Sequence, residues 1–330
     1  MDRRALRRRL LIVAGVLGVV LLIAAAGVAL LLGSLAAGFD GGRRVIPSQQ
    51  AFPAPSTRPS DSVGDAQNIL LLGSDTRGSA PTSLSAIRGQ RSDTMLLLHL
   101  PADGKGAYLV SLMRDSWVSV PGHGRTKLNA AFSLGGVPLT VQTVESLLGV
   151  RIDHVAVVSF SGFRGLTDAL GGVTVENQVA FQNLGFDFPQ GRTVLDGDEA
   201  LAYVRARYPF SDGDYQRVRN QRAYLRGVTQ ALLARGTLLD PGRLRGTVDA
   251  ISPYLLVDQG LDSGYLASLA LRLRDLRGDD LVAFTAPTSG TGTEGDQSVV
   301  YLDDDAVRQL GEHLRNDTMS TFSACDTSIC

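Results

Sequence analysis

Arginine side chains are concentrated in one short part of this sequence, where they could bind a multiply charged anion. The stretch DGDEALAYVRARYPFSDGDYQRVRNQR, residues 196–222, carries five arginines: Arg205, Arg207, Arg217, Arg219 and Arg222. Arginine binds phosphate oxygens through a planar fork of N–H donors, and its charge is not lost by titration near neutral pH. If these side chains converge, they would suit a phosphate or pyrophosphate group. If they lie on the wet face of a helix, they have no ligand.

Aspartate stands close to arginine at three boundaries of predicted strands. A single Asp–Arg pair at a strand end is more often a cap or a surface ion pair, but ligands of α/β proteins also gather at strand ends. Three such boundaries together favour a shared site. They are LLLGSDTR with Asp75 and Arg77, GQRSDTMLLL with Arg91 and Asp93, and VSLMRDSW with Arg114 and Asp115.

The spacing of the clustered arginines predicts which of them share a helix face. On a helix through residues 196–207, Arg205 and Arg207 project about 200° apart, so only one of them would point inward unless the helix breaks near Tyr208-Pro209. On a helix from 214 to 235, Arg217 and Gln221 lie four residues apart on one face. Arg219 lies off that face and is expected in solvent.

The elements that must position these residues alternate between strands and helices, which predicts a single α/β domain over residues 68–316. Continuous apolar runs such as NILLLGSD and TMLLLHL are typical of a sheet covered on both faces. Strands are expected at 68–75, 94–100, 107–113, 154–160, 173–177 and 281–287. Helices are expected at 138–150, 161–172, 196–207, 214–235, 243–256 and 265–276.

The first residues read as a membrane anchor. Residues 1–9 hold five arginines, and residues 10–32 are uncharged. A helix of that length spans about 34 Å, enough for a bilayer core of roughly 30 Å. The preceding arginines predict a cytoplasmic N-terminus and an extracytoplasmic domain on a single-pass protein of the cell membrane. A cleaved signal peptide is the rival reading, but its apolar core is usually shorter. Residues 33–67, rich in Pro, Ser and Ala, are expected to be a flexible linker.

Charge and cysteine usage exclude some classes of protein. The formal net charge is −1, which argues against a nucleic-acid partner. Arginine makes up 30 of the 32 basic residues, as a GC-rich genome would produce without any functional cause. Cys325 and Cys330 fall in the expected tail, residues 317–330. Outside the membrane they could form a disulfide or remain free thiols, and the sequence leaves both open.

Seven sequence blocks occur in an order that resembles the LytR-CpsA-Psr family of cell-envelope proteins. The resemblance covers residues 68–235 and, more loosely, FTAPTSGTG from Phe284. The blocks are GSDTR, RSDTM, MRDS, KLNAAF, GVRIDHVAVVSFSGFRGLTDALGGV, LDGDEALAYVRAR and DYQRVRNQR. The resemblance implies a mixed-sheet α/β domain flanked by helices behind an N-terminal transmembrane helix. It also implies an enzyme that moves a glycopolymer from a polyprenyl pyrophosphate carrier onto peptidoglycan, which forms a phosphodiester and releases polyprenyl phosphate.

The resemblance also implies site residues. Asp75 and Asp93 match acidic residues around Mg²⁺, for which Mn²⁺ could substitute. The resemblance places pyrophosphate binding on Arg91, Arg114, Arg205, Arg207, Arg217 and Gln221, and a catalytic role on Asp75, Asp93, Arg114, Arg205 and Arg217. Asn220 departs from the family, where many members have arginine. The loop between the two aspartates is longer than usual.

Several alternatives remain open at this stage. The same residues would serve a polyprenyl pyrophosphate hydrolase, with water as acceptor, or a membrane-anchored lipid-binding regulator without catalysis. The polymer could be teichoic acid, capsule or arabinogalactan. The carrier chain is expected in an apolar pocket between sheet and helices, with candidate residues on the strands and on 139–150. Asp75 or Asp93 could accept the proton of the acceptor hydroxyl, although a carboxylate bound to a metal is a poor base.

Overall fold

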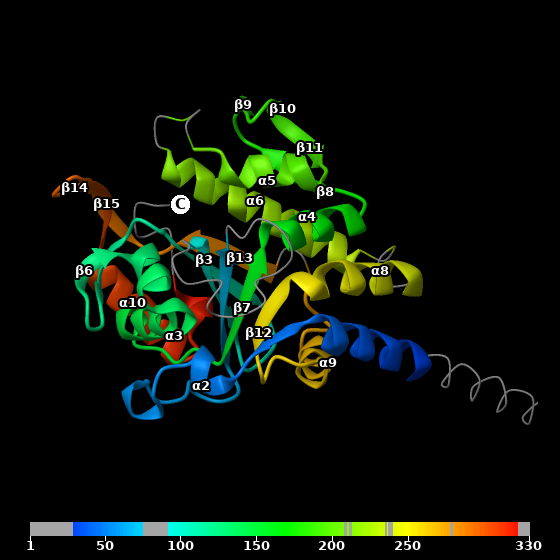
Figure 1. The fold of residues 1–330 in the computed structure, drawn as a ribbon, viewed down its shortest axis with the longest axis horizontal. Helices are drawn as coiled ribbons and strands as arrows, with labels where there is room; N and C mark the ends of the chain where they lie inside the picture. Colours follow the sequence, from blue (N-terminus) through cyan, green and yellow to red (C-terminus); the bar gives the residue numbers. More distant parts are fainter. Residues whose placement is uncertain are drawn as a thin grey trace, which may run out of the picture.

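The computed structural model describes residues 29–74, 92–207, 210, 213–234, 236, 240–277 and 280–322. Within these residues, seven strands form one mixed central sheet, in the order β1-β12-β7-β2-β3-β4-β13 (Figure 1). The strands of this sheet are β1 (Arg44–Ile46), β2 (Gln67–Ser74), β3 (Ser92–Leu100), β4 (Ala107–Leu112), β7 (His154–Ser159), β12 (Leu255–Asp258) and β13 (Leu281–Thr285). The predicted α/β class and its mixed sheet are confirmed.

The register of the sheet decides which residues face which layer. β2 runs antiparallel to β3 and parallel to β7, and Leu71 lies opposite both Leu96 and Ala156. Side chains alternate between the two faces of a strand. Leu70 and Leu72 therefore enter one core layer, where both are almost fully buried, and Leu71 points to the other layer. Both faces are covered, as the unbroken apolar runs predict.

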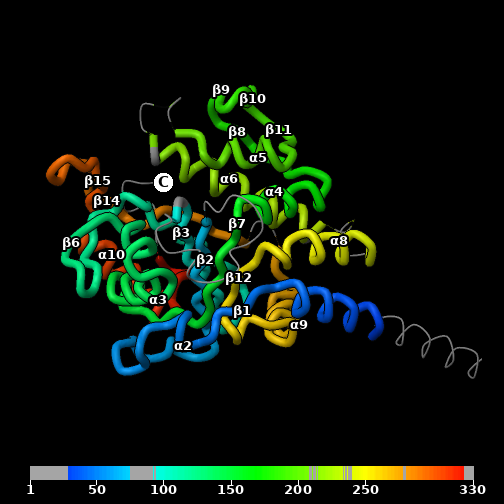
Figure 2. Tube along the Cα trace, in the orientation of Figure 1, coloured from blue at the N-terminus to red at the C-terminus, as the bar shows by residue number. Residues whose placement is uncertain are grey.

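Helices cover the two faces of the sheet differently. The face of Leu70 packs against α3 (Leu128–Leu148), α10 (Asp304–Arg315) and the short α2 (Ser48–Ala51). The face of Leu71 lies under several helices (Figures 1 and 2). These helices leave a cavity at one end. They are α4 (Phe160–Ala169), α5 (Gly197–Arg205), α6 (Asp214–Leu233), α8 (Pro241–Ile251) and α9 (Ser263–Arg272).

Four pairs of short strands complete the described part of the chain. The strands β8 (Val173–Asn177) and β11 (Gly191–Leu195) pair with each other, and α6 packs against β8. The remaining pairs are β9 (Phe181–Asn183) with β10 (Phe186–Phe188), β5 (Trp117–Val120) with β6 (Gly124–Lys127), and β14 (Thr288–Glu294) with β15 (Gln297–Leu302). Short 3-10 helices lie at Pro55–Thr57, Ser252–Tyr254 and Met319–Thr321.

Several predicted helix boundaries differ from those in the structure, three of them for a clear local reason. The helix expected at 138–150 begins earlier, at Leu128, and bends at Gly136, whose φ of 66° only glycine adopts readily. Pro138 follows the bend, where its missing N–H costs little. The cap of α4 is Ser159 rather than a serine after Phe160. The helix expected at 243–256 ends at Ile251, and its last residues form β12 instead.

The prediction that residues 33–67 form a flexible linker is wrong for much of that segment. Residues 29–42 are helical, and β1 pairs in parallel with β12. Phe39, Ile46 and Ala51 are buried, so apolar contacts hold a segment whose composition suggested a linker. Most of the predicted anchor 10–32, together with Cys325 and Cys330, lies outside the described residues. Among the helices of the described residues, none has the length and apolar character needed to cross a bilayer.

The close approach of α6 to β8 generates a test of stability. A Cβ at Gly227 would lie 2.2 Å from the carbonyl oxygen of Thr174, whereas a Cβ at Gly246 on α8 would meet nothing within 4 Å. Gly227→Ala should therefore lower the free energy of unfolding by about 1–3 kcal/mol. Gly246→Ala should raise it by about 0.4–1 kcal/mol, since alanine restricts the unfolded chain. Thermal denaturation of both variants measures this, and equal shifts would contradict the packing described.

Candidate functional site

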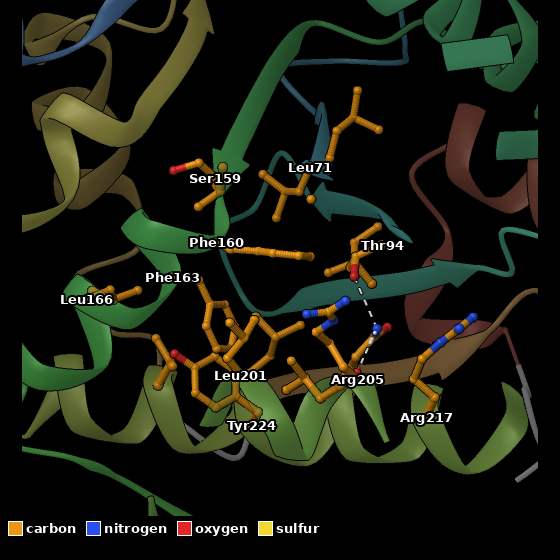
Figure 3. Close-up of a pocket in the computed structure, with 18 of the residues that line it drawn as sticks. Leu71, Thr94, Ser159, Phe160, Phe163, Leu166, Leu201, Arg205, Arg217 and Tyr224 are labelled. Carbon is orange, nitrogen blue, oxygen red and sulfur yellow. Dashed lines mark hydrogen bonds between the residues drawn. The ribbon is translucent and has the colours of Figure 1, made fainter. Parts of the chain in front are cut away.

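A cavity of about 340 Å³ lies between the sheet and the helices that cover the Leu71 face (Figure 3). Strands β2, β3 and β7 form its floor, and α4, α5, α6 and α8 contribute its other walls. Its apolar walls come from Leu71, Leu72, Leu96, Val158, Phe160, Phe163, Leu166, Leu201, Val204, Tyr224, Leu225, Val228 and Ile251. The other lining residues are Gly73, Thr94, Arg114, Ser159, Arg205, Arg207, Arg217 and Gln221.

The structure brings four of the predicted arginines to this one cavity. They are far apart in sequence: Arg114 follows β4, Arg205 ends α5, Arg207 lies just beyond it, and Arg217 is on α6. None of the described lining residues is an aspartate or glutamate. Four guanidinium groups beside apolar walls produce a strongly positive potential, because a low-dielectric surface focuses the field. The cavity is therefore suited to a ligand with a negatively charged group.

Arg205 and Arg207 both reach the cavity because α5 ends between them. Ala206 has φ −60° and ψ 122°, which is outside the helical region, so the 200° separation of a continuous helix does not apply. The sequence YP that follows restricts the residue before the proline to extended conformations, which is a reason for the helix to stop here. The guanidinium carbon of Arg205 lies 4.7 Å from the centre of the Phe160 ring, a cation–π contact that helps to hold it at the wall.

On α6, Arg217 and Gln221 share the face toward the cavity, as their spacing of four residues predicts. Only 5% of Arg217 is exposed. The amide nitrogen of Gln221 donates to the Thr94 hydroxyl at 3.1 Å and to the Val204 carbonyl at 3.3 Å, so it joins α6 to β3 and to α5. Arg219 is absent from the lining and donates to Gln216 instead. Thr94 was missed by sequence reasoning, although it directly follows Asp93.

Asn220 is the position on α6 where this chain departs from the family pattern, in which arginine is common. Its side chain is 1% exposed and does not line the cavity. The amide nitrogen donates to the Tyr203 carbonyl at 3.1 Å, and the amide oxygen accepts from Gln216 at 2.9 Å. The residue is part of the contact between α6 and α5, where a buried amide with satisfied hydrogen bonds is stable. The change from arginine therefore leaves the cavity lining intact at Arg217.

Arg114 is held by a buried acidic residue that sequence reasoning read only as part of a strand boundary. A carboxylate oxygen of Asp115 lies 3.4 Å from Nε of Arg114, and the other lies 3.2 Å from Nζ of Lys127. The Asp115 side chain is 8% exposed, so water screens these contacts little. The KLNAAF block thus supplies a second cation, Lys127, to the carboxylate that orients Arg114. Asp115 acts here as a positioning residue.

The remaining predicted site residues are Asp75, Arg91 and Asp93. Asp75 and Arg91 lie outside the described residues, and of Asp93 only the backbone is described. That backbone lies in a β-bulge, because Ser92 pairs with Ser74 while Thr94 pairs with Gly73. Bulges re-aim side chains and are frequent near active sites. Within the described part of the chain, no group of three His, Cys, Asp or Glu side chains could hold a metal. The assignment of Mg²⁺ to these aspartates stays a prediction.

The cavity changes character along α6. Along α6 the lining residues run from the polar Arg217 and Gln221 to Tyr224, Leu225 and Val228. Figure 3 shows Arg217 at one end of the cavity and Tyr224 on the side of Phe163 and Leu166. From Arg217 to Val228 the helix rises about 16 Å. Burial raises the pKa of Tyr224 to about 12, and its hydroxyl bonds to that of Thr167 at 2.7 Å. Tyr224 is thus neutral at physiological pH, so this wall carries no charge.

The predicted pocket residues on 139–150 are not part of the cavity. Val141, Val144 and Leu148 on α3 are buried in the core on the opposite face of the sheet. Helical periodicity alone identifies a buried face but not the layer in which it is buried. The strand candidates are placed as predicted, since β2, β3 and β7 form the floor.

The chain is thus an α/β protein whose apolar cavity ends in converging arginines, an arrangement suited to an amphiphile with an anionic head group. A family model described as the LytR_cpsA_psr family matches residues 46–316. The chain belongs to this family. The match covers the central sheet apart from most of β1, the helices α2 to α10 and every residue that lines the cavity.

Two relatives illustrate the similarity in sequence. "Cell wall biosynthesis protein LcpA" of Corynebacterium glutamicum is 31% identical over an alignment of 280 residues, and the match covers 72% of this chain and 53% of the relative. "Polyisoprenyl-teichoic acid--peptidoglycan teichoic acid transferase TagU" of Enterococcus faecalis is 32% identical over 255 residues, 76% of this chain and 78% of the relative. The chain thus spans about half the length of the first relative.

Solved structures share the fold. The crystal structure of B. subtilis TagV has a TM-score of 0.65 at 23% identity, and the match covers 77% of this chain and 97% of TagV. A structure described as "TagT bound to LI-WTA" has a TM-score of 0.61 at 24% identity, and the match covers 81% of this chain and 99% of TagT.

The apolar end of the cavity can be tested separately from the arginines. Val228→Trp should fill this end and weaken the binding of a long-chain polyprenyl phosphate, while affinity for inorganic pyrophosphate stays the same. Each buried methylene contributes about 0.8 kcal/mol, so displacing two of them costs about tenfold in affinity. Gln230→Trp adds the same ring on the exposed face of α6 and serves as the control. Titration calorimetry measures both ligands, and parallel losses for the two would contradict a separate apolar subsite.

Proposed function

We propose that this protein is a phosphotransferase that moves a cell-wall glycopolymer from a polyprenyl pyrophosphate carrier onto peptidoglycan. The observation that carries the proposal is the arrangement of Arg114, Arg205, Arg207 and Arg217 at one end of an apolar cavity. A polyprenyl pyrophosphate has the matching two parts, an apolar chain and a diphosphate. Support also comes from TagU of E. faecalis, which is named as a transferase of teichoic acid to peptidoglycan. The fold shared with the structure of TagT bound to LI-WTA is consistent with it.

The proposed reaction uses these groups as follows. An acceptor hydroxyl oxygen on peptidoglycan attacks the phosphorus that carries the glycopolymer. The bond from this phosphorus to the bridging oxygen breaks, and polyprenyl phosphate leaves with the electron pair. The product is a phosphodiester between polymer and peptidoglycan, and the hydroxyl proton passes to a base. The guanidinium groups stabilise the charge on the phosphoryl oxygens and on the leaving phosphate, which is the main requirement of phosphoryl transfer.

Magnesium, or manganese in its place, is proposed as the cofactor, held by Asp75 and Asp93. Mg²⁺ binds through one or two carboxylates together with phosphate oxygens and water, so two aspartates are a suitable donor set. In this structure the bulge places the backbone of Asp93 beside the end of β2, where Ser74 is the last described residue before Asp75. When bound, the metal would neutralise phosphate oxygens. The arginines would bind and orient the diphosphate.

The proposed acceptor, peptidoglycan, lies outside the cytoplasmic membrane. The proposal therefore places the domain on the same side of the membrane. Residues 10–32 are proposed as the single anchor, with residues 1–9 in the cytoplasm. The described helix 29–42 includes the last residues of the apolar run, and the large exposed side chains of Leu30 and Leu32 in it support this proposal. The net charge of −1 argues against nucleic acid as a partner, because proteins that bind nucleic acid usually have a clearly basic domain.

Replacing one arginine of the cavity tests the proposed chemistry. Arg217→Ala should lower transfer of a labelled polyprenyl-pyrophosphate-linked teichoic acid to peptidoglycan by at least about a hundredfold, because it removes a donor that stabilises the transferred phosphate. Arg219→Ala, two residues further along α6, should retain transfer since its side chain does not line the cavity. Circular dichroism checks that both fold. Near-normal transfer by Arg217→Ala would discard the role of this residue.

The acceptor distinguishes transfer from hydrolysis. With the same labelled substrate, release of polyprenyl phosphate should depend on added peptidoglycan. We expect little product in its absence, because water lacks the binding contacts that position the acceptor hydroxyl. Release at the same rate without peptidoglycan would show a hydrolase instead. Binding of the substrate without any turnover under both conditions would favour a non-catalytic lipid-binding protein.

A further inference from the structure

The helix 29–42 is docked on the domain by specific contacts. Phe39 is buried, with 7% of its surface exposed. Asp40 accepts hydrogen bonds from the backbone N–H and the hydroxyl of Ser263 at the start of α9, and these bonds lower the pKa of its carboxyl group. Nη1 of Arg43 donates to the Leu261 carbonyl at 2.9 Å. Contacts to residues more than 200 positions away fix the direction of this helix relative to the sheet.

Two glycines let the same helix approach α8 closely. A Cβ at Gly38 would lie 2.9 Å from a carboxylate oxygen of Asp249, and a Cβ at Gly42 would lie 2.7 Å from Cβ of Ser252. Residues four apart share one face of a helix, so this face is the one that contacts α8. Gly33 and Gly41 have nothing within 4 Å of an added Cβ. The close contact at Gly38 and Gly42 therefore fixes the angle between helix 29–42 and α8.

The docked helix lies at the apolar end of the cavity. Ile251, the last residue of α8, lines the cavity, and Val248 one turn earlier packs against the buried cluster that contains Phe39. In Figures 1 and 2, the N-terminal ends of helix 29–42 and α8 extend to the same side as the C-terminal end of α6. Along α6, this is the direction from Arg217 toward Val228. The arginines therefore lie at the far end of the cavity from helix 29–42.

The surface on this side carries exposed apolar and basic residues. Leu30 and Leu32 are 75% and 60% exposed, and they continue the uncharged run that starts at residue 10. On α8, the side chains of Arg243 and Arg245 are 62% and 60% exposed. Their carboxylate neighbours, Asp240 and Asp249, lie 3.8 Å and 3.5 Å away and are themselves exposed, so these pairs bind weakly and leave the arginines able to meet other anions.

The size of the cavity gives a reason for its apolar end to lie near a membrane. A volume of about 340 Å³ is at the small end of pockets for drug-sized ligands. A long polyprenyl chain does not fit into it completely, and the rest of the chain must have apolar surroundings elsewhere. If the apolar end faces a bilayer, the chain can remain partly in the lipid while its diphosphate reaches the arginines.

We infer that the exposed side of α8, which Arg243 and Arg245 flank, rests together with Leu30 and Leu32 on a phospholipid bilayer with anionic head groups. The docking of helix 29–42 on α8 holds the apolar end of the cavity against that bilayer. This inference rests on the proposed membrane anchor. It adds that the domain has one fixed orientation on the membrane and that α8 contacts lipid head groups directly.

Fluorescence quenching tests the orientation. The full-length protein, with Cys325→Ser and Cys330→Ser, is reconstituted in vesicles of phosphatidylcholine and phosphatidylglycerol that contain a head-group quencher. A dye is attached through Gly246→Cys on α8, where an added side chain meets nothing, or through Asp296→Cys in the exposed turn of β14–β15. The dye at position 246 should be strongly quenched and the dye at 296 should not. Equal quenching at both positions would overturn the inference.

Matched substitutions test the two contacts that cause the orientation. Gly42→Leu should remove most of the quenching at position 246, whereas Gly41→Leu should leave it unchanged. If Gly42→Leu proves unstable in thermal denaturation, Arg243→Glu with Arg245→Glu provides an independent test. That double variant should lose quenching in phosphatidylglycerol vesicles at low salt, with little change in pure phosphatidylcholine. Unchanged quenching in the double variant would contradict head-group contact. None of these measurements needs turnover, so their failure leaves the proposed transfer standing.

Discussion

The structure depends on holding several guanidinium groups of like charge together beside an apolar cavity. Such groups repel one another, and the fold must oppose that repulsion when no anion is bound. The opposition comes from independent elements: Asp115 holds Arg114, the Phe160 ring holds Arg205, and the buried amides of α6 fix the helix that carries Arg217. A bound diphosphate would relieve this repulsion. The repulsion in the ligand-free protein would therefore increase the affinity for the diphosphate.

One face of the central sheet carries a filled hydrophobic core, and the other face carries the cavity. On one face, α3 and α10 fill a continuous core with Leu70, Leu72 and Leu97. On the other, α4, α5 and α6 stand away from the sheet at one end and leave the cavity. The contact of α6 with β8, made possible by Gly227, gives that helix support from outside the sheet. A hollow layer can persist because the opposite layer supplies a core of its own.

Much of the fold could be predicted from local pattern. Unbroken apolar runs identify β2, β3 and β4, and the capping box of Asp196 with Glu199 marks the start of α5. Sequence blocks also indicated which arginines would share a site. Features that depend on contacts between distant residues were not predictable. Examples are the burial of Phe39 and Ile46, the side of the sheet on which α3 packs, and the hydrogen bond from Gln221 to Thr94. Each depends on tertiary partners that composition and periodicity do not reveal.

The end of α5 at Ala206 has a consequence for how the arginines respond to a ligand. Arg205 belongs to a helix, and its position is tied to the whole of α5. Arg207 follows the break and is not part of that helix. The two guanidinium groups are thus held by separate parts of the chain although only one residue lies between them. In the proposed transfer, the two phosphates of the carrier would meet arginines whose positions are set independently.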